Sequence, residues 1–380
     1  MARLGDVAAI SASSQGIDDK RIWLLNLDMV EQQTGSIIAY NYVSKDELNG
    51  SIIQFDTDNV LYSKLRPNLN KVVLPSQNGF ATSEMLPLRP DTRVLCKEYL
   101  AVYLRSDSFV SWAISKTAGA KMPRLGTKEL LNKEIPLPSL DEQYHIAMVL
   151  DKISNLIALR KQQLAKLDKL IKARFVEMFG DPVRNDRNWP IITLGELAEI
   201  KIGPFGALLH KEDYIEGGHA LVNPSHIIDG KIVIDPQLTV SDPKYRELSA
   251  YALQREDIVL GRRGEMGRCA VVHEDGLLCG TGSMIIRPGV QTKSYFLQTI
   301  LSSPGYKKII EDKAVGVTMQ NLNVPIVSVM TLPLLPLDFQ EQYIEFLQKV
   351  DQCKLTIQQG LDKLETMKKA LMQQYFGGGR

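Results

Sequence analysis

The chain contains an internal repeat with a period of about 190 residues. Four motifs of the first half return in the same order in the second: LGDVAAI (4–10) as LGELAEI (194–200), DNVLYSKLR (58–66) as EDIVLGRRG (256–264), TSEM (82–85) as TGSM (281–284), and IPLPSLDEQY (135–144) as LPLLPLDFQEQY (332–343). The offset stays between 190 and 199. The sequence therefore predicts a tandem duplication, in which each unit has a globular part followed by a helical part.

The repeat is clearest at the end of each half. Residues 150–180 align with 347–377 at a constant offset of 197, and ten of these 31 positions are identical. Random pairing would give about two identities, taking roughly 6% per position from composition. The alignment without gaps indicates one continuous helix in each copy.

Both helical parts show alternating spacings of three and four between apolar residues, which predicts a coiled-coil seam. In the first copy the seam is Ile146, Leu150, Ile153, Ile157, Leu164, Leu167, Ile171 and Met178, interrupted by Arg160 and Arg174; in the second it is Leu347, Val350, Cys353, Ile357, Leu361, Leu364, Met367, Leu371 and Tyr375. An aspartate after each proline-rich strand is expected to cap the helix, and a glycine to end it.

An apolar seam of this length needs a partner, and the other copy in the same chain is the simplest one. We expect the helices to pack on each other through Ile146, Leu150, Ile153, Ile157, Leu164, Leu167, Ile171, Leu347, Val350, Ile357, Leu361, Leu364 and Leu371. The alternative is that each helix packs only on its own globular part, although a globular face would favour a wider apolar stripe.

The globular parts, residues 1–138 and 181–336, contain many short runs typical of β-strands, separated by NG, DG and GG turns. Helices are predicted at 97–116 and 294–312. With the helical segments 139–180 and 337–377, the chain is predicted to be mixed α/β (α+β): two strand-rich domains joined by two long coiled-coil helices, with an internal pseudo-two-fold repeat. A length of 380 residues also exceeds what one core usually supports.

Catalytic motifs are absent from the sequence. NPSH (223–226) lacks the second proline and the aromatic ring of an amino-methyltransferase motif, and the glycine spacing of GRRGEMG (261–267) does not match a dinucleotide fingerprint. His210, His219 and His226 could gather on a metal, but no carboxylate or cysteine pattern accompanies them. We expect no catalysis and no metal or cofactor in this chain.

Cysteine usage and hydropathy predict a cytoplasmic protein. The four cysteines are far apart, with no CxxC pair, which indicates reduced thiols rather than disulfides or zinc. The first residues lack the apolar run of a signal peptide, and no stretch approaches 18 consecutive apolar residues.

Two globular halves, each entered through an LGE/LGD motif and left through an LPLP–EQ motif and a heptad helix, closely resemble the specificity (S) subunit of type I restriction-modification enzymes. The stretch NWPIITLGELAEIKIGPFGALLHKEDYIEGGHALVN (188–223) matches the family's entry to a target recognition domain. The resemblance implies that the halves are target recognition domains for double-stranded DNA and that the two long helices pack antiparallel. It also implies methyltransferase (M) subunits that bind S-adenosylmethionine, and restriction (R) subunits that use ATP and Mg.

Two pairs of loops carry the residues that we expect to contact DNA. The first pair supplies Lys64 and Arg66 in one half and Arg262, Arg263 and Arg268 in the other; the second supplies Lys121 and Arg124 in one half and Thr318, Gln320 and Asn321 in the other. Guanidinium groups suit guanine edges or phosphates, and amides suit adenine. The alternative for any one of them is a solvated loop side chain.

Charge is nearly balanced throughout. Positive against negative residues number 16 to 15 in residues 1–140, 7 to 5 in 141–180, 16 to 18 in 181–337 and 5 to 6 in 338–377. Because duplex affinity depends on phosphate neutralisation, we expect weak DNA binding by the isolated chain and an obligate role within a complex. Similar halves separated by helices predict a bipartite target with an unread spacer. The alternatives are the recognition subunit of another DNA-modification system, a coiled-coil adaptor for proteins, and a standalone enzyme.

Overall fold

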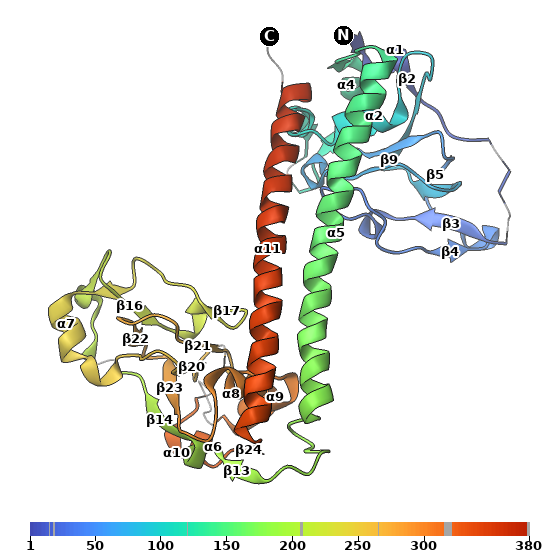
Figure 1. Cartoon of the computed structure of the whole chain (residues 1–380). Helices are drawn as coiled ribbons and strands as arrows, with labels where there is room; N and C mark the ends of the chain where they lie inside the picture. The colour runs from blue at the N-terminus through green and yellow to red at the C-terminus, as the bar shows by residue number, and fades with distance from the viewer. Residues whose placement is uncertain are drawn as a thin grey trace. The chain divides into compact units, whose positions relative to one another are not determined.

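The computed structural model describes residues 1–14, 16–17, 20–119, 121–205, 208–264, 266–314 and 321–377. The chain divides into two compact units (Figure 1): Met1–Gln163 with Ile357–Arg380, and Leu164–Thr356. Each unit contains one globular part and part of both long helices.

The globular part of the first unit holds two four-stranded sheets with the strand orders β2–β9–β6–β7 and β4–β3–β8–β5. All pairings are antiparallel except that of β3 with β8. The strands are β1 (Ala2–Arg3), β2 (Ala8–Ile10), β3 (Ile22–Leu25), β4 (Tyr42–Val43), β5 (Ile52–Phe55), β6 (Val60–Ser63), β7 (Val72–Val73), β8 (Gly79–Thr82), β9 (Met85–Pro90), β10 (Thr117–Ala118), β11 (Arg124–Leu125) and β12 (Glu134–Ile135).

The second unit repeats the first of these sheets, whereas its other sheet has the parallel pair at one edge rather than in the middle. Its sheets have the orders β14–β23–β20–β21 and β15–β19–β16–β22, and β16 runs parallel to β22 as β3 does to β8. The strands are β13 (Ile191–Thr193), β14 (Ala198–Ile202), β15 (Tyr214–Ile215), β16 (His219–Val222), β17 (Ile227–Ile228), β18 (Lys231–Ile232), β19 (Thr239–Val240), β20 (Ile258–Gly261), β21 (Cys269–Val271), β22 (Leu278–Cys279), β23 (Ser283–Pro288) and β24 (Thr331–Pro333). The predicted duplication and the mixed α/β class are confirmed.

The segments 97–116 and 294–312, each predicted as helical, contain two helices each rather than one. A serine side chain caps the second member of each pair: Ser106 Oγ accepts from the Phe109 N–H at 3.3 Å, and Ser303 Oγ accepts from the Tyr306 N–H at 3.4 Å. The shorter helices are α1 (Leu4–Val7), α2 (Lys97–Leu104), α3 (Asp107–Ser115), α4 (Thr127–Asn132), α6 (Leu194–Leu197), α7 (Asp242–Glu247), α8 (Ser294–Leu301), α9 (Pro304–Lys313) and α10 (Val324–Ser328).

The two long helices are α5 (Leu140–Phe179) and α11 (Leu337–Phe376), each of 40 residues. All thirteen residues expected to pack between them are buried or half-buried. Cys353 and Met367 are exposed instead of lying in the seam, and Lys354 and Lys368 are half-buried at those turns. Their aliphatic stems can cover apolar surface while the ammonium groups reach water.

Within each unit the helices contact both each other and the globular core. In the first unit, Lys161 pairs with Glu365 at 2.9 Å, and the Phe376 ring lies 5.6 Å from those of Tyr99 and Tyr103. In the second, Lys354 pairs with Asp168 at 2.6 Å, and Phe175 packs on Tyr343 and Phe296. The sequence left open whether the helices pack on each other or on the globular parts, and the structure shows both kinds of contact.

A buried glutamine fixes the start of each long helix. Gln143 accepts from the Cys96 N–H at 2.9 Å and donates to the carbonyls of Val94 and Pro138, both at 2.9 Å. Gln340 makes the equivalent contacts with the Lys293 N–H, Gln291 O and Leu335 O. The cap of α5 is Ser139 bonded to Glu142, not the predicted aspartate.

Candidate nucleic-acid interface

The two loop segments predicted to contact DNA in the first half lie against each other, and we call this contact the first loop junction. Leu65, just after β6, forms an antiparallel bridge with Arg124. The Arg66 N–H donates to Pro123 O at 2.8 Å, and the Leu125 N–H donates to Lys64 O at 2.9 Å. The fold thus brings together segments almost 60 residues apart in the sequence.

The corresponding segments of the second half also meet, in the second loop junction. Arg263, just after β20, forms an antiparallel bridge with Asn321. The Leu322 N–H donates to Arg262 O at 3.1 Å, and the Arg262 N–H donates to Gly282 O at 2.9 Å. The last bond repeats that from the Lys64 N–H to Glu84 O at 3.0 Å in the first junction.

These matching bonds define which positions of the two junctions are equivalent. Lys64 corresponds to Arg262, Leu65 to Arg263, Arg124 to Asn321 and Glu84 to Gly282. Arg66, which sequence comparison grouped with the arginines, corresponds by this register to Gly264. The two junctions therefore have one backbone arrangement and different side chains at each equivalent position.

Arg262 is the predicted contact least suited to touch DNA. It is only 4% exposed, and its guanidinium donates to Thr281 O at 3.3 Å, Leu322 O at 3.3 Å and Asn321 Oδ1 at 3.1 Å. Burial, and next the neighbouring charge of Arg263, lower the pKa of Arg262. These bonds hold the loop after β20 against the backbone and side chain of Asn321 and Leu322.

Arg263 and Asn321 are better placed for contact. Arg263 is exposed, and its Nε lies 3.3 Å from Asn321 Oδ1. Because arginines only donate hydrogen bonds, the amide oxygen of Asn321 must face both of them. This leaves its amide N–H groups as the atoms for another partner, which suits a base acceptor such as N7 rather than bidentate pairing with adenine.

The remaining predicted residues differ in their surroundings. Arg66, Lys121 and Arg124 are exposed, whereas Arg268 is half-buried and donates to Ile227 O at 3.2 Å. Arg66 has a φ of 49°, a left-handed conformation uncommon for a residue other than glycine. Thr318 and Gln320 lie outside the described residues.

Sequence comparison missed Glu84, which lies at the centre of the first junction. Its carboxylate accepts from Arg124 Nε at 3.1 Å and lies 4.0 Å from Lys64 Nζ. The TSEM repeat includes Glu84, but matching TSEM with TGSM pairs Glu84 with Ser283. The backbone hydrogen bonds instead make Gly282 its equivalent. One carboxylate therefore pairs with two of the cations predicted to contact DNA.

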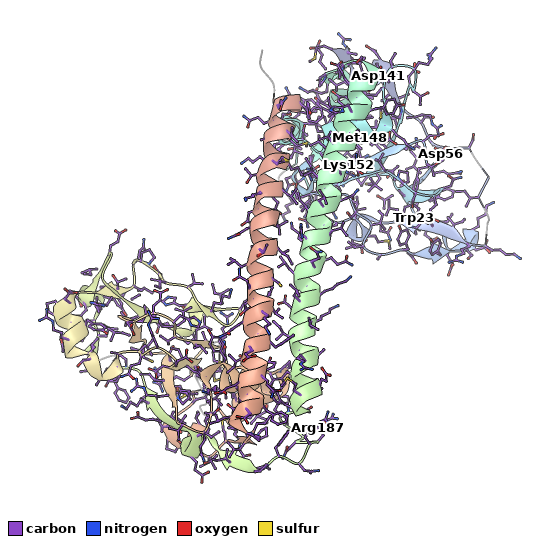
Figure 2. All side chains as sticks on the ribbon, viewed as in Figure 1. Trp23, Asp56, Asp141, Met148, Lys152 and Arg187 are labelled. Carbon is purple, nitrogen blue, oxygen red and sulfur yellow. The ribbon has the colours of Figure 1, made fainter. Side chains whose placement is uncertain are left out.

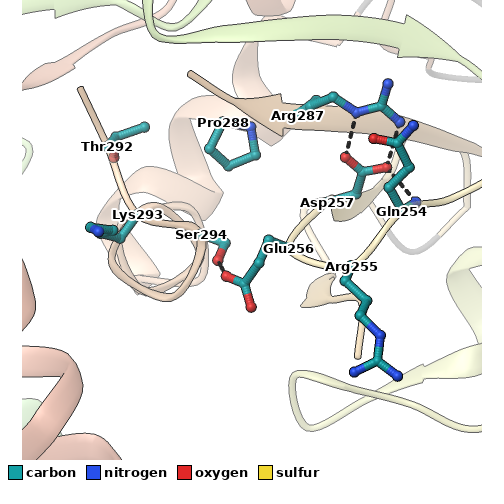
Figure 3. A pocket seen from close by; sticks show the side chains of 9 residues that line it. All are labelled: Gln254, Arg255, Glu256, Asp257, Arg287, Pro288, Thr292, Lys293 and Ser294. Carbon is teal, nitrogen blue, oxygen red and sulfur yellow. Dashed lines mark hydrogen bonds and ion pairs between the residues drawn. The ribbon is translucent and has the colours of Figure 1, made fainter. Parts of the chain in front are cut away.

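In each half a buried carboxylate pairs with an arginine near the end of the strand, β9 or β23, whose start adjoins the loop junction. Asp257 accepts from Arg287 through both oxygens, at 2.7 and 2.8 Å, and from the Gln254 N–H at 2.8 Å (Figure 3). In the first half Asp56 pairs with Arg89 through one oxygen, Oδ2, and its Oδ1 accepts from the Asp58 N–H at 2.9 Å. The hollow in Figure 3 is lined by this ion pair and by Glu256 bonded to Ser294, so these carboxylates already have partners.

Three of the four cysteines are buried, and the side chains of His219 and His226 bond to protein groups. Burial raises the pKa of both the Cys96 and Cys269 thiols to about 11 and that of Cys279 further, which keeps the thiols protonated. His226 bonds to Leu221 O at 2.8 Å, and His219 bonds to Gly276 O and Asp242. Among the described residues, no cluster of three or more His, Cys, Asp or Glu could hold a metal ion.

Neither long helix, nor any other helix in the described ranges, is sufficiently long and apolar to cross a membrane.

The chain is similar to proteins of one kind over nearly its whole length. Residues 3–169 and 186–366 match a family model described as the type I restriction modification DNA specificity domain. The MjaVIII specificity subunit of Methanocaldococcus jannaschii is 23% identical over 316 residues, which are 78% of this chain and 73% of that protein. The EcoDI specificity subunit of Escherichia coli is 26% identical over 126 residues, 33% of this chain and 27% of that protein.

Solved structures share the fold. The type I restriction-modification S subunit from M. genitalium superposes with a TM-score of 0.64 at 16% identity, covering 100% of this chain and 96% of that one. A chain from a study of complex assembly in a type I R-M system gives a TM-score of 0.61 at 17% identity, covering 99% and 96%.

Proposed function

The chain belongs to the type I restriction modification DNA specificity family, and from this we propose that each loop junction reads one half of a bipartite DNA sequence. As a specificity subunit, the chain is the DNA sequence recognition component of a restriction-modification system and is itself non-catalytic. What the family leaves open is which residues discriminate between bases and how the two half-sites are spaced.

The observation that carries the proposal is the equivalence of the two junctions. Two backbone hydrogen bonds and the strand bridge are the same, but Leu65 is replaced by Arg263 and Arg124 by Asn321. Direct readout depends on which donors and acceptors face the base edges. Reading two different half-sites would require the same backbone arrangement with different side chains, as in these two loop junctions.

The two helices suit the role of a spacer. Each has 40 residues, or about 60 Å at 1.5 Å per residue, and α5 contributes residues to both compact units. Half-sites on one face of a duplex lie about 34 Å apart for each helical turn. In this proposal, the length of the helices selects the number of unread base pairs.

Partner subunits supply the chemistry. The family implies DNA, methyltransferase and restriction partners, and specificity subunits generally need no cofactor. In our proposal, S-adenosylmethionine binds to the M subunits, and ATP and Mg to the R subunits. The near-neutral halves lack the positive charge that dominates duplex affinity, so the partners would also contribute much of the phosphate binding.

Selection from a random duplex library tests base reading. The complex of this chain with its M subunits would be used, comparing wild type with Arg263→Ala. Arg263 belongs to the second junction alone, so the variant should relax the preference at one or two positions of one half-site, at a cost of about 1 to 3 kcal/mol per position. Uniform weakening would indicate a phosphate contact, and unchanged selection would reject the assignment.

The spacer is tested separately. Inserting the same number of residues into both helices should lengthen the selected spacer while both half-sites stay unchanged. A lengthened variant that folds and still selects the original spacing would contradict the role of the helices.

A further inference from the structure

The first globular part carries a set of exposed aromatic rings that the loop junctions do not include. Tyr40 and Tyr42, at the edge strand β4, are 52% and 40% exposed. Their rings are nearly parallel, with an interplanar angle of 11° and centroids 6.4 Å apart. Together with Trp23 and Arg21 they form what we call the aromatic platform.

The platform rests on a rigid base. Trp23, labelled on β3 in Figure 2, is 1% exposed, and its ring lies 5.4 Å from that of Tyr40. Phe55 packs edge-on against Trp23 at 5.3 Å. Gln77 donates to the Tyr42 hydroxyl at 2.8 Å, so the hydroxyl end of this ring is also held. Little side-chain freedom remains to be lost when a ligand binds.

A positive charge accompanies the rings. The Arg21 guanidinium lies 4.7 Å from the centroid of the Tyr42 ring, in a cation–π contact, and Arg21 is exposed. Since Arg21 occupies one face of Tyr42, the Tyr40 ring is the more available surface. Rigid aromatic faces with an adjacent arginine are the combination that binds unpaired nucleobases and their phosphates.

We propose that the aromatic platform binds an unpaired nucleobase, which stacks on Tyr40 while Arg21 contacts the neighbouring phosphate. A base within a duplex exposes only its edges in the grooves, so stacking on Tyr40 requires a base that has left the helix or belongs to a single strand. The platform lies on different strands from the first loop junction, and its occupation does not depend on base reading there.

The charge balance favours a nucleic acid contact of this kind. Residues 1–140 carry 16 positive and 15 negative side chains, so the first half has little electrostatic attraction for DNA. Stacking supplies affinity that salt does not screen, at about 1 to 3 kcal/mol per base. A neutral recognition domain therefore gains most from an aromatic contact.

Binding of the full chain to two labelled strands tests the proposal. One is a single strand of about twelve thymidines, and the other has the same number of phosphates with abasic sites in place of the bases. The wild-type chain should bind the thymidine strand about tenfold more tightly. Tyr40→Ala should remove this difference and leave binding to a duplex unchanged, whereas Tyr40→Phe, which keeps the ring, should preserve it.

Tyr144→Ala is the matched control, because Tyr144 is 55% exposed on α5 and lies outside the platform. It should behave as wild type. Thermal unfolding of Tyr40→Ala would show that the first unit remains folded. Equal affinity of the wild-type chain for the two strands would overturn the proposal. So would a Tyr40→Ala variant that binds both strands normally but loses a partner subunit, because the platform would then be a protein contact.

Failure here can be distinguished from failure of base reading. If the aromatic platform does not bind a base, the duplex sequence selected by the complex is unaffected. If the loop junctions do not read bases, the chain still prefers the thymidine strand over the abasic strand.

Discussion

One guanidinium nitrogen of Arg262 lies 3.1 Å from Oδ1 of Asn321, joining two loops that are almost 60 residues apart in the sequence. Arg263 approaches the same oxygen at 3.3 Å but from an exposed position. The two neighbouring arginines therefore differ in role: the first holds the junction together, and the second is available to DNA.

Arg262→Ala should destabilise the second unit, because Thr281 O and Leu322 O lose the guanidinium donor and Asn321 Oδ1 keeps only Arg263. Hydrogen bonds to charged groups contribute about 1.5 to 3 kcal/mol, so a loss on the order of 2 kcal/mol is expected in chemical denaturation. Arg263→Ala, the matched control, should change the unfolding free energy by under about 0.5 kcal/mol. Equal effects of the two substitutions would mean that the two arginines do not differ in role.

Glu84→Gln should strengthen non-specific DNA binding. Glu84 pairs with Lys64 and Arg124, and its neutralisation would release both cations for phosphates. The slope of log affinity against log salt should steepen by about 1 for each new phosphate contact. Glu129→Gln makes the same charge change at an exposed site on α4 and should have little effect. An unaltered salt slope for Glu84→Gln would show that the carboxylate does not restrain these cations.

Gln143→Leu should lower the stability of the first unit by about 2 to 3 kcal/mol, because the Cys96 N–H and the carbonyls of Val94 and Pro138 lose a buried partner. The control is Gln342→Leu, since Gln342 is exposed on α11. Thermal or chemical unfolding provides the comparison. A Gln143 variant as stable as the Gln342 variant would mean that the glutamine does not fix the start of α5.

Native thiol reactivity should be limited to Cys353. Cys96, Cys269 and Cys279 are buried with raised pKa values, about 11 for the first two, so they remain protonated near pH 8. A chromogenic thiol reagent should therefore titrate one cysteine in the folded chain and four after denaturation. Because a raised pKa favours the folded state only while the thiol is protonated, stability should fall as the pH rises from about 9 through 11. Rapid reaction of more than one native thiol would contradict the burial.

The sequence predicted the duplication and the two long helices, because both depend on local patterns and on self-similarity. It placed Cys353 and Met367 in the seam because they are apolar, whereas in the structure both are exposed and Lys354 and Lys368 are half-buried. Both exit motifs contain an EQ pair, Gln143 in the first and Gln342 in the second, but the buried equivalent of Gln143 is Gln340. The motif matched neighbouring residues in the sequence, whereas hydrogen bonds to distant residues define which glutamines are equivalent.

The candidate interface shows the same limit. Both loop pairs were found from the repeat, yet their meeting in each half depends on long-range strand bridges. The burial of Arg262 and the central place of Glu84 follow from those bridges, so no spacing in the sequence could indicate them. Base reading by any one of these residues stays a prediction.

The most direct measurement is sequencing of methylated DNA in a host that carries this chain with its M subunits. We expect a bipartite modified motif, two short specified half-sites separated by an unspecified spacer, and expect Arg263→Ala with Asn321→Ala to alter one half-site only. A continuous motif, or a change in both half-sites from substitutions confined to the second junction, would contradict the account.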